Sequence, residues 1–178
     1  MAEKIFGKPL ITQEAVQKRI KELGQKITRD YAGKDLYLIG VLKGAFAFYA
    51  DIARAISLPL RVGFISVSSY QGATHTSGKV KIVSDLKEEI VGKDVLLVED
   101  IVDSGLTLQF LKKKFNAKKP NSLKVCSLLN KAAGRQVDVD IDYVGFEIPD
   151  KYIVGYGLDY DNKYRNLPYM AVLENIEE

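Results

Sequence analysis

Apolar strands and amphipathic helices alternate along the chain. The continuous apolar run at residues 36–42 is typical of a strand that is covered on both faces of a sheet, and residues 95–98 and 123–129 are predicted as two further buried strands. Further strand candidates lie at residues 60–68, 81–83, 143–146, 153–156 and 169–173. Between them the sequence predicts helices at residues 12–31, 45–56 and 106–115. This alternation predicts an α/β fold, in which helices flank a twisted and mainly parallel sheet of about five strands.

The first helix illustrates the helical pattern. Its apolar residues recur at spacings of four, three and four, at Val16, Ile20, Leu23 and Ile27. Such spacing places one apolar stripe along a helix, and Thr12 stands where a side chain can cap the first turn. Residues 69–79, in contrast, are polar and include two glycines. We therefore predict a long loop there, of the kind that often has a function.

Length and composition limit the classes of protein that remain. At 178 residues the chain fits one domain, 1–178. A single cysteine, Cys126, excludes an intrachain disulfide, and a single histidine, His75, excludes a histidine-rich metal site. The net charge of +3 is too weak to predict a nucleic-acid partner. No apolar run is long enough to span a membrane or to form a signal peptide, so we expect a cytoplasmic protein without a membrane partner.

The segment at residues 95–108 carries the strongest chemical signal. An apolar strand is followed by two carboxylates, Glu99 and Asp100, and a short turn then leads into a helix. The N-terminus of a helix offers backbone N–H groups and the positive end of its dipole, which suit a phosphate. Gly105 lets the backbone approach an anion, and Ser104 and Thr107 can add hydroxyl donors. The sequence therefore predicts an anion site at this turn.

The carboxylates need a different ligand. Glu99 and Asp100 can accept hydrogen bonds from sugar hydroxyls, either directly or through Mg²⁺, which prefers oxygen ligands. The chain has neither the P-loop pattern nor the Gly-x-Gly-x-x-Gly fingerprint. These absences argue against a Walker nucleotide site and against a dinucleotide-binding fold.

Residues 98–108 resemble the motif with which type I phosphoribosyltransferases bind 5-phosphoribosyl-1-pyrophosphate (PRPP). Segments 42–44, 69–70, 128–131, 144–152 and 157–160 resemble, in the same order, the branch of that family that acts on 6-oxopurines. The resemblance implies the type I phosphoribosyltransferase fold, with a core at about residues 35–150 and a small hood formed by the N-terminal and C-terminal segments. It also implies Mg²⁺-dependent transfer of phosphoribose from PRPP to hypoxanthine or guanine, yielding IMP or GMP and pyrophosphate.

The family resemblance assigns roles to the residues that would bind PRPP. The 5-phosphate would lie against Asp103, Ser104, Gly105, Leu106 and Thr107. Glu99 and Asp100 would hold the ribose hydroxyls and, with Asp159, the magnesium ion. The pyrophosphate would contact Arg165 and a loop at Lys43 and Gly44, and in the family a cis peptide bond often precedes that lysine.

The resemblance also assigns the residues that would meet the purine. Asp103 would act as the catalytic general base or acid near N7, and Lys131 would donate to O6, which disfavours adenine. Tyr152 would stack on the base, and the backbone carbonyl of Ile153 would meet its edge. Ser69 and Tyr70 would open a mobile lid at residues 69–80 that excludes water during the reaction.

Two other functions stay open at this point. The acceptor could be xanthine as well as guanine, because Lys131 and Tyr152 favour a 6-oxopurine without choosing among such bases. Alternatively, the same fold could serve a regulator that binds PRPP without turnover. Leu106, at a position where mammalian members carry lysine, favours a bacterial enzyme. The resemblance further implies a homodimer or homotetramer.

Overall fold

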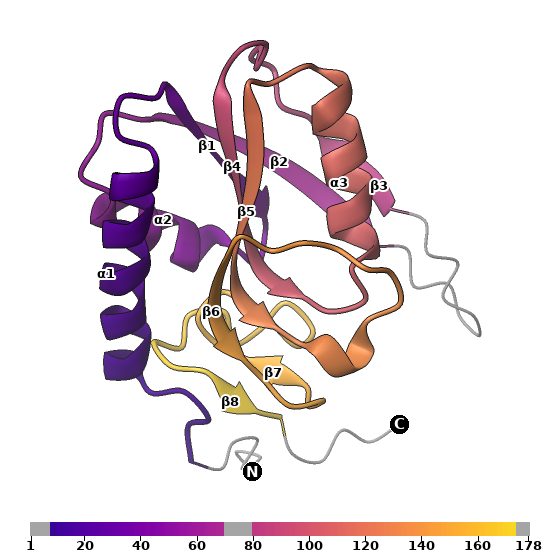
Figure 1. Ribbon diagram of the computed structural model, residues 1–178. Helices are drawn as coiled ribbons and strands as arrows, with labels where there is room; N and C mark the ends of the chain where they lie inside the picture. Colours follow the sequence, from indigo (N-terminus) through magenta and orange to yellow (C-terminus); the bar gives the residue numbers. More distant parts are fainter. Residues whose placement is uncertain (1–7, 70–79, 174–178) are drawn as a thin grey trace.

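The computed structural model describes residues 8–69 and 80–173. Within them, six strands form one sheet in the order β3-β2-β1-β4-β5-β6 (Figure 1). Strands β2, β1, β4, β5 and β6 pair in parallel, and β3 pairs antiparallel with β2 at one edge. The strands are β1 (Leu36–Leu42), β2 (Arg61–Ser69), β3 (Val80–Ser84), β4 (Asp94–Val102), β5 (Ser122–Asn130) and β6 (Tyr143–Glu147). The predicted α/β fold with a mainly parallel sheet is confirmed.

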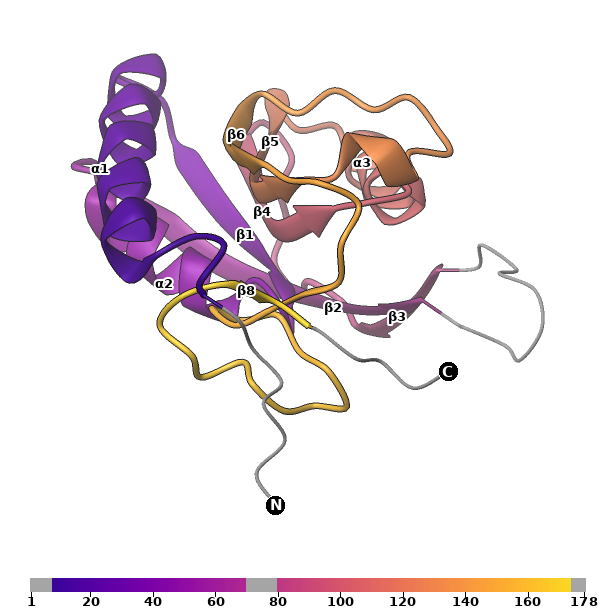
Figure 2. The same ribbon diagram turned by 90° about the horizontal axis from the view of Figure 1, so that it is seen from below.

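Helices cover both faces of this sheet. On one face lie α1 (Gln13–Asp30) and α2 (Phe46–Ala55), and on the other lies α3 (Leu106–Ala117), as Figures 1 and 2 show. The apolar stripe predicted for α1 is buried, and the side chain of Thr12 accepts a hydrogen bond from the N–H of Ala15 at 3.3 Å. Each face therefore has its own apolar core, and the central strands lie between the two.

Strand β4 is longer than the sequence pattern suggested. The apolar run predicted a strand that ends at Val98, and this prediction is wrong by four residues. Pairing with β5 continues through Glu99, which is opposite Ser127, to Val102, which is opposite Asn130. Backbone pairing with a neighbouring strand holds the two carboxylate-bearing residues in the sheet, although their side chains are not apolar.

The two ends of the described chain meet in a small second sheet. Strand β7 (Ile153–Val154) pairs antiparallel with β8 (Ala171–Val172), and Ile11 bridges to Met170. Both strands are shorter than predicted, and β7 ends at Val154 because Gly155, Tyr156 and Gly157 all have positive φ and turn the chain. Figure 1 shows this sheet beside the end of the main sheet where β4 and β5 finish, which is where the family resemblance expects a hood. None of the described helices is long and apolar enough to cross a membrane.

Candidate active site

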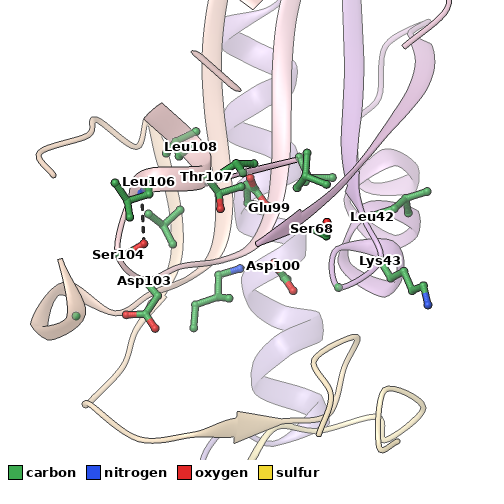
Figure 3. A pocket seen from close by; sticks show the side chains of 18 of the residues that line it. Leu42, Lys43, Ser68, Glu99, Asp100, Asp103, Ser104, Leu106, Thr107 and Leu108 are labelled. Carbon is green, nitrogen blue, oxygen red and sulfur yellow. Dashed lines mark hydrogen bonds between the residues drawn. The ribbon is translucent and has the colours of Figure 1, made fainter. Parts of the chain in front are cut away.

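A cavity opens at the carboxyl ends of the central strands, where open α/β sheets bind their ligands. Its volume is about 650 Å³, and its walls come from β1, β2, β4, the turn before α3 and the segment between β7 and β8. Segments that are far apart in the sequence therefore meet in one place (Figure 3). The predicted site residues that line it are Lys43, Gly44, Glu99, Asp100, Asp103, Ser104, Gly105, Leu106, Thr107, Asp159 and Arg165.

The turn between β4 and α3 presents its backbone to the cavity. Gly105 has a φ of 84°, and a Cβ at this position would lie 2.8 Å from the carbonyl oxygen of Val137. Glycine alone adopts this conformation without a steric penalty. The carbonyl of Ser104 accepts hydrogen bonds from the N–H groups of Gln136 and Val137, at 2.9 and 3.2 Å, which anchor the turn. Because α3 begins at Leu106, its first N–H groups and the positive end of its dipole lie at the cavity wall.

Two adjacent carboxyl groups of β4 lie where water solvates them poorly. Glu99 is 5% exposed, and its Oε1 has no hydrogen-bond partner among the described residues. Burial, followed by the nearby charge of Asp100, raises the pKa of Glu99 well above its usual value. Burial also raises the pKa of Asp100 to about 6, although a hydrogen bond from the N–H of Ile101 opposes the shift. Both carboxyl groups therefore favour a ligand that brings hydroxyl donors or positive charge.

The loop after β1 places its backbone directly against Asp100. A Cβ at Gly44 would lie 1.6 Å from Oδ2 of Asp100, so this contact requires a residue without a side chain. The peptide bond between Leu42 and Lys43 is cis, as the family resemblance implied. Lys43 and Gly44 consequently line the same cavity as the β4 carboxyl groups.

Asp159 and Arg165 close another side of the cavity as a bonded pair. Nη2 of Arg165 lies 2.7 Å from Oδ1 of Asp159, and its Nη1 donates to the carbonyl of Gly157 at 2.7 Å. The other carboxylate oxygen of Asp159 accepts from the N–H of Asn162 at 2.8 Å. These contacts hold one guanidinium and one carboxylate at fixed positions beside Asp100. Their charges act on the pKa of Asp100 in opposite directions, Arg165 lowering it and Asp159 raising it, in addition to the larger effect of burial.

Lys131 directly follows β5. It does not line the cavity, but it forms an ion pair with Asp103, which does. Its Nζ is 2.8 Å from Oδ2 of Asp103 and 3.2 Å from Oδ1 of Asp150. Partial burial disfavours the charged amine, yet the hydrogen bonds and charges of the two carboxylates outweigh burial and raise the pKa of Lys131. The ammonium is therefore charged and held between two segments of the chain.

Tyr152 and Ile153 lie at the start of β7. Tyr152 is 48% exposed, and its hydroxyl donates to the carbonyl of Asp159 at 3.1 Å. The carbonyl of Tyr152 accepts from the N–H of Leu173, the residue after β8, at 2.9 Å. Since alternate residues of an antiparallel pair turn their backbone groups away from the partner strand, the carbonyl of Ile153 points away from β8. The side chain of Ile153 is buried in the core.

Comparison with known proteins identifies the family. A model of the phosphoribosyl transferase domain matches residues 10–161. The chain is 49% identical to the hypoxanthine-guanine phosphoribosyltransferase of Bacillus subtilis over 167 residues, which span 94% of this chain and 93% of the relative. The chain belongs to the hypoxanthine-guanine phosphoribosyltransferase family.

Solved structures support the same assignment for this phosphoribosyltransferase. A hypoxanthine phosphoribosyltransferase from Staphylococcus aureus matches it with a TM-score of 0.91 and 44% identity, covering 96% of this chain and 92% of that one. A hypoxanthine-guanine phosphoribosyltransferase from Bacillus anthracis matches with a TM-score of 0.90 and 50% identity, covering 94% and 99%. The predicted type I phosphoribosyltransferase fold is confirmed, and the chain is a transferase of purine salvage.

Some predicted site residues lie away from the cavity or beyond the described residues. Lys131, Tyr152 and Ile153 do not line the cavity, although Lys131 and Tyr152 each bond to a residue that does. Ser69 ends β2, where it is paired with Val80. Tyr70, and with it residues 70–79 of the predicted lid, lies outside the described residues.

Sequence reasoning missed three residues of this phosphoribosyltransferase site. Asp150 bonds to Lys131, Gln136 lines the cavity, and a Cβ at Gly134 would lie 1.8 Å from Oδ1 of Asp103. Asp150 belongs to a segment that resembles the family, which was the available signal. Nothing in the local pattern around Gly134 or Gln136 indicates that they lie beside the turn before α3, since that contact depends on the path of the chain after β5.

The donor atoms fit a magnesium ion only in combination with a substrate. Within the part of the chain that the structure describes, no group of three acidic, histidine or cysteine residues is close enough to hold a metal ion alone. Glu99 nevertheless has a buried carboxylate oxygen without a protein partner among the described residues, and Asp100 and Asp159 line the same cavity. Mg²⁺ keeps water or substrate oxygens in its shell, so an incomplete set of carboxylates suits it.

Proposed function

We propose that this enzyme transfers the phosphoribosyl group of PRPP to hypoxanthine or guanine, forming IMP or GMP and pyrophosphate. The observation that carries the proposal is the convergence of three kinds of site on one cavity. These are the glycine-containing turn before α3, the Glu99–Asp100 pair of β4, and the Lys43–Gly44 loop together with Arg165. Each suits one part of PRPP, whose phosphate, ribose hydroxyls and pyrophosphate need different partners. Relatives named hypoxanthine-guanine phosphoribosyltransferase, at about half identity over nearly the whole chain, support it.

The proposed PRPP site uses the backbone for phosphate and carboxylates for hydroxyls. The 5-phosphate lies at residues 103–107, where the N-terminus of α3 supplies N–H donors. Glu99 and Asp100 accept from the ribose hydroxyls, which relieves the cost of burying both carboxylates. Arg165 and the Lys43–Gly44 loop hold the pyrophosphate, because a guanidinium matches phosphate oxygens in pairs.

Magnesium completes the proposed PRPP site. Glu99, Asp100 and Asp159 are the residues that would hold it, together with substrate oxygens. When bound, the ion would offset the negative charge of the departing pyrophosphate. The protein's own contribution is to orient PRPP and to keep Arg165 beside the leaving group.

The proposed base site lies beside the turn before α3. Lys131 donates to O6, the Tyr152 ring stacks on the purine, and the carbonyl of Ile153 accepts from the base edge. As N9 of the purine bonds to the ribose carbon and the bond to pyrophosphate breaks, Asp103 accepts the proton from N7. The contact between Lys131 and Asp103, at 2.8 Å, supports these roles because it places the two groups within reach of adjacent purine atoms.

We also propose the wider setting of the enzyme. One domain, with its core at about residues 35–150 and a hood from both chain ends, would assemble as a homodimer or homotetramer. Exposed apolar side chains support an interface between copies: Phe46 on α2, and Val62 and Phe64 on β2, are 46%, 55% and 43% exposed. A reducing cytoplasm suits the free and buried thiol of Cys126.

A steady-state assay with PRPP and Mg²⁺ tests the function. Hypoxanthine, guanine, xanthine and adenine are offered separately, and nucleotide and pyrophosphate are measured. We expect turnover of hypoxanthine or guanine and rejection of adenine. Turnover of xanthine at the same efficiency as guanine would instead indicate a xanthine-guanine enzyme. Binding of PRPP without turnover of any base would overturn the proposal in favour of a PRPP-binding regulator.

A further inference from the structure

Lys131 is shared between two carboxylates that come from different parts of the fold. Asp103 belongs to the turn before α3 and contacts Nζ at 2.8 Å, and Asp150 belongs to the segment between β6 and β7 and contacts it at 3.2 Å. The lysine side chain is 15% exposed, whereas the side chains of Asp103 and Asp150 are 46% and 68% exposed. The ammonium is thus the most enclosed member of this trio, and the two carboxylates are the more exposed members.

If the proposed function holds, the purine must break the contact between Lys131 and Asp103 in order to bind. A 6-oxopurine presents the acceptor O6 next to an N7–H donor, and these two groups complement an ammonium and a carboxylate. The base edge must therefore enter between Lys131 and Asp103 and replace their direct contact with one hydrogen bond to each. Adenine presents an amino donor in place of O6, so it offers the ammonium no acceptor in exchange for the contact with Asp103.

Space around the pair limits how it can separate. A Cβ at Gly134 would lie 1.8 Å from Oδ1 of Asp103 and 3.3 Å from Cε of Lys131, so both side chains pack against the backbone of this glycine. Asp103 is thereby confined on the side of Gly134, and the ammonium must stay close to its present position when the base enters. A second partner that remains in contact with Lys131 during this exchange keeps it there.

We propose that Asp150 is a positioning residue for base recognition: it holds the Lys131 ammonium while the purine edge displaces that ammonium from Asp103. The inference rests on the proposed function and adds to it a residue that touches no substrate. With Asp150 present, Lys131 passes from two carboxylates to one carboxylate and O6. Without it, the ammonium would have O6 alone, so the exchange would be less favourable and base affinity would fall.

The surrounding backbone does not depend on the Asp150 side chain. The N–H of Ile148 donates to the carbonyl of Asn130 at 3.1 Å, and the N–H of Lys151 donates to the carbonyl of Pro149 at 2.8 Å. These bonds shape the turn through main-chain atoms on either side of Asp150. Removing one carboxylate charge should therefore leave the fold intact, which makes the residue suitable for substitution.

The test compares Asp150→Asn and Asp150→Glu with the unaltered enzyme, using hypoxanthine, PRPP and Mg²⁺. We expect Asp150→Asn to raise KM for hypoxanthine roughly 3- to 10-fold, with a change below about twofold in KM for PRPP and in kcat. Asp150→Glu should recover most of the lost affinity. Asp140→Asn is the matched control, because Asp140 is an exposed aspartate that faces Lys112 at 4.0 Å away from the cavity.

The outcomes separate the inference from the function on which it rests. An unaltered enzyme that turns over no base contradicts the proposed function itself. An active enzyme whose Asp150→Asn variant keeps its KM for hypoxanthine overturns only the role of Asp150. So does a variant in which KM for both substrates rises together with a fall in Tm, since that pattern indicates general destabilisation. A selective rise in KM for the base, reversed by Asp150→Glu, supports the role.

Discussion

The proposed PRPP side and the proposed purine side of this site are built in different ways. On the proposed PRPP side, the turn is five consecutive residues, 103–107, and it presents backbone atoms whose positions are fixed by Gly105 and by the start of α3. On the purine side, Lys131 and Tyr152 are side chains from separate segments, and they are held by ion pairs and a hydrogen bond. A site made of backbone is specified locally, whereas a site made of side chains depends on what surrounds it.

The two sides also differ in how they bear charge. Glu99 and Asp100 are carboxyl groups whose pKa values are raised by burial, so the PRPP side disfavours its own charges until a ligand arrives. Lys131 has its charge supported by two carboxylates. We therefore expect the loss of a carboxylate charge on the PRPP side to lower activity while raising stability. Substitutions on the purine side should alter base recognition. The following variants test this difference.

Removing the Asp100 charge should have the largest effect. Asp100→Asn takes away a carboxylate proposed to bind the ribose and magnesium, so we expect kcat/KM for PRPP to fall by about 10²-fold, equivalent to about 3 kcal/mol. Steady-state kinetics across PRPP and Mg²⁺ concentrations measures it. Asp161→Asn removes an exposed carboxylate nearby and should change kcat/KM little. Activity within threefold of the unaltered enzyme in Asp100→Asn would remove Asp100 from the PRPP site.

Removing the Lys131 ammonium should act on the base instead. We expect Lys131→Ala to lower kcat/KM for hypoxanthine by about 30-fold, or about 2 kcal/mol, and to reduce discrimination against adenine, because the O6 donor is lost. PRPP affinity, measured by calorimetry, should stay within about twofold, as in Lys112→Ala. A loss of PRPP affinity equal to the loss for the base would show that the two sides are not independent.

The raised pKa of Asp100 predicts a pH-dependent stability. A carboxyl whose pKa rises from 3.8 to about 6 on folding favours the folded state when protonated, so stability falls as pH rises from 4 through 6. The full shift corresponds to about 3 kcal/mol, and the partial access of solvent to the cavity reduces this to about 1–2 kcal/mol. Urea unfolding without ligand should therefore show Asp100→Asn becoming more stable than the unaltered enzyme above pH 6. Parallel stability curves for the two proteins from pH 4.5 to pH 8 would contradict this prediction.

Gly105→Ala tests whether the backbone forms the phosphate site. The substitution places a Cβ 2.8 Å from the carbonyl of Val137 at a φ of 84°, so we expect a loss of about 1–2 kcal/mol in stability together with weaker PRPP binding. Gly33→Ala is a close control, because Gly33 has a φ of 76° and a Cβ there meets no described atom within 4 Å. The control should share the backbone strain and keep its PRPP affinity. Equal PRPP affinity in the two variants would argue against a phosphate at this turn.

Tyr152→Phe should have the smallest effect. Tyr152 belongs to both proposed sides, because its ring is proposed to stack on the base and its hydroxyl bonds to Asp159. It retains the ring proposed to stack on the base but loses the hydrogen bond to the carbonyl of Asp159, which is 3.1 Å long and half exposed. We expect a two- to threefold rise in KM for PRPP, about 0.5 kcal/mol, with KM for hypoxanthine nearly unchanged. Tyr160→Phe, which alters the ring that meets Tyr152 edge-on, is the control. A larger change for the base than for PRPP would limit Tyr152 to the purine side.

Local sequence patterns accounted for much of this molecule. The helical spacing of α1, the mainly apolar segments of β1, β4 and β5, and the turn at residues 103–107 are visible without a structure, because burial and backbone conformation act on neighbouring residues. The end of β4 was misjudged at Val98, since the pairing that extends it to Val102 comes from β5. A strand that carries two carboxylates has no local signature.

The fold class, the family resemblance and the residue types available for a phosphate, a sugar and a purine could all be predicted from the printed sequence. Which of these residues share a cavity, and which partners hold them, depends on how the chain folds. It placed Gly44 against Asp100, Gly134 against Asp103, and Asp150 beside Lys131. The physical reason is range: periodicity and turn chemistry act over a few residues, whereas desolvation, ion pairing and close packing depend on atoms brought together from distant segments.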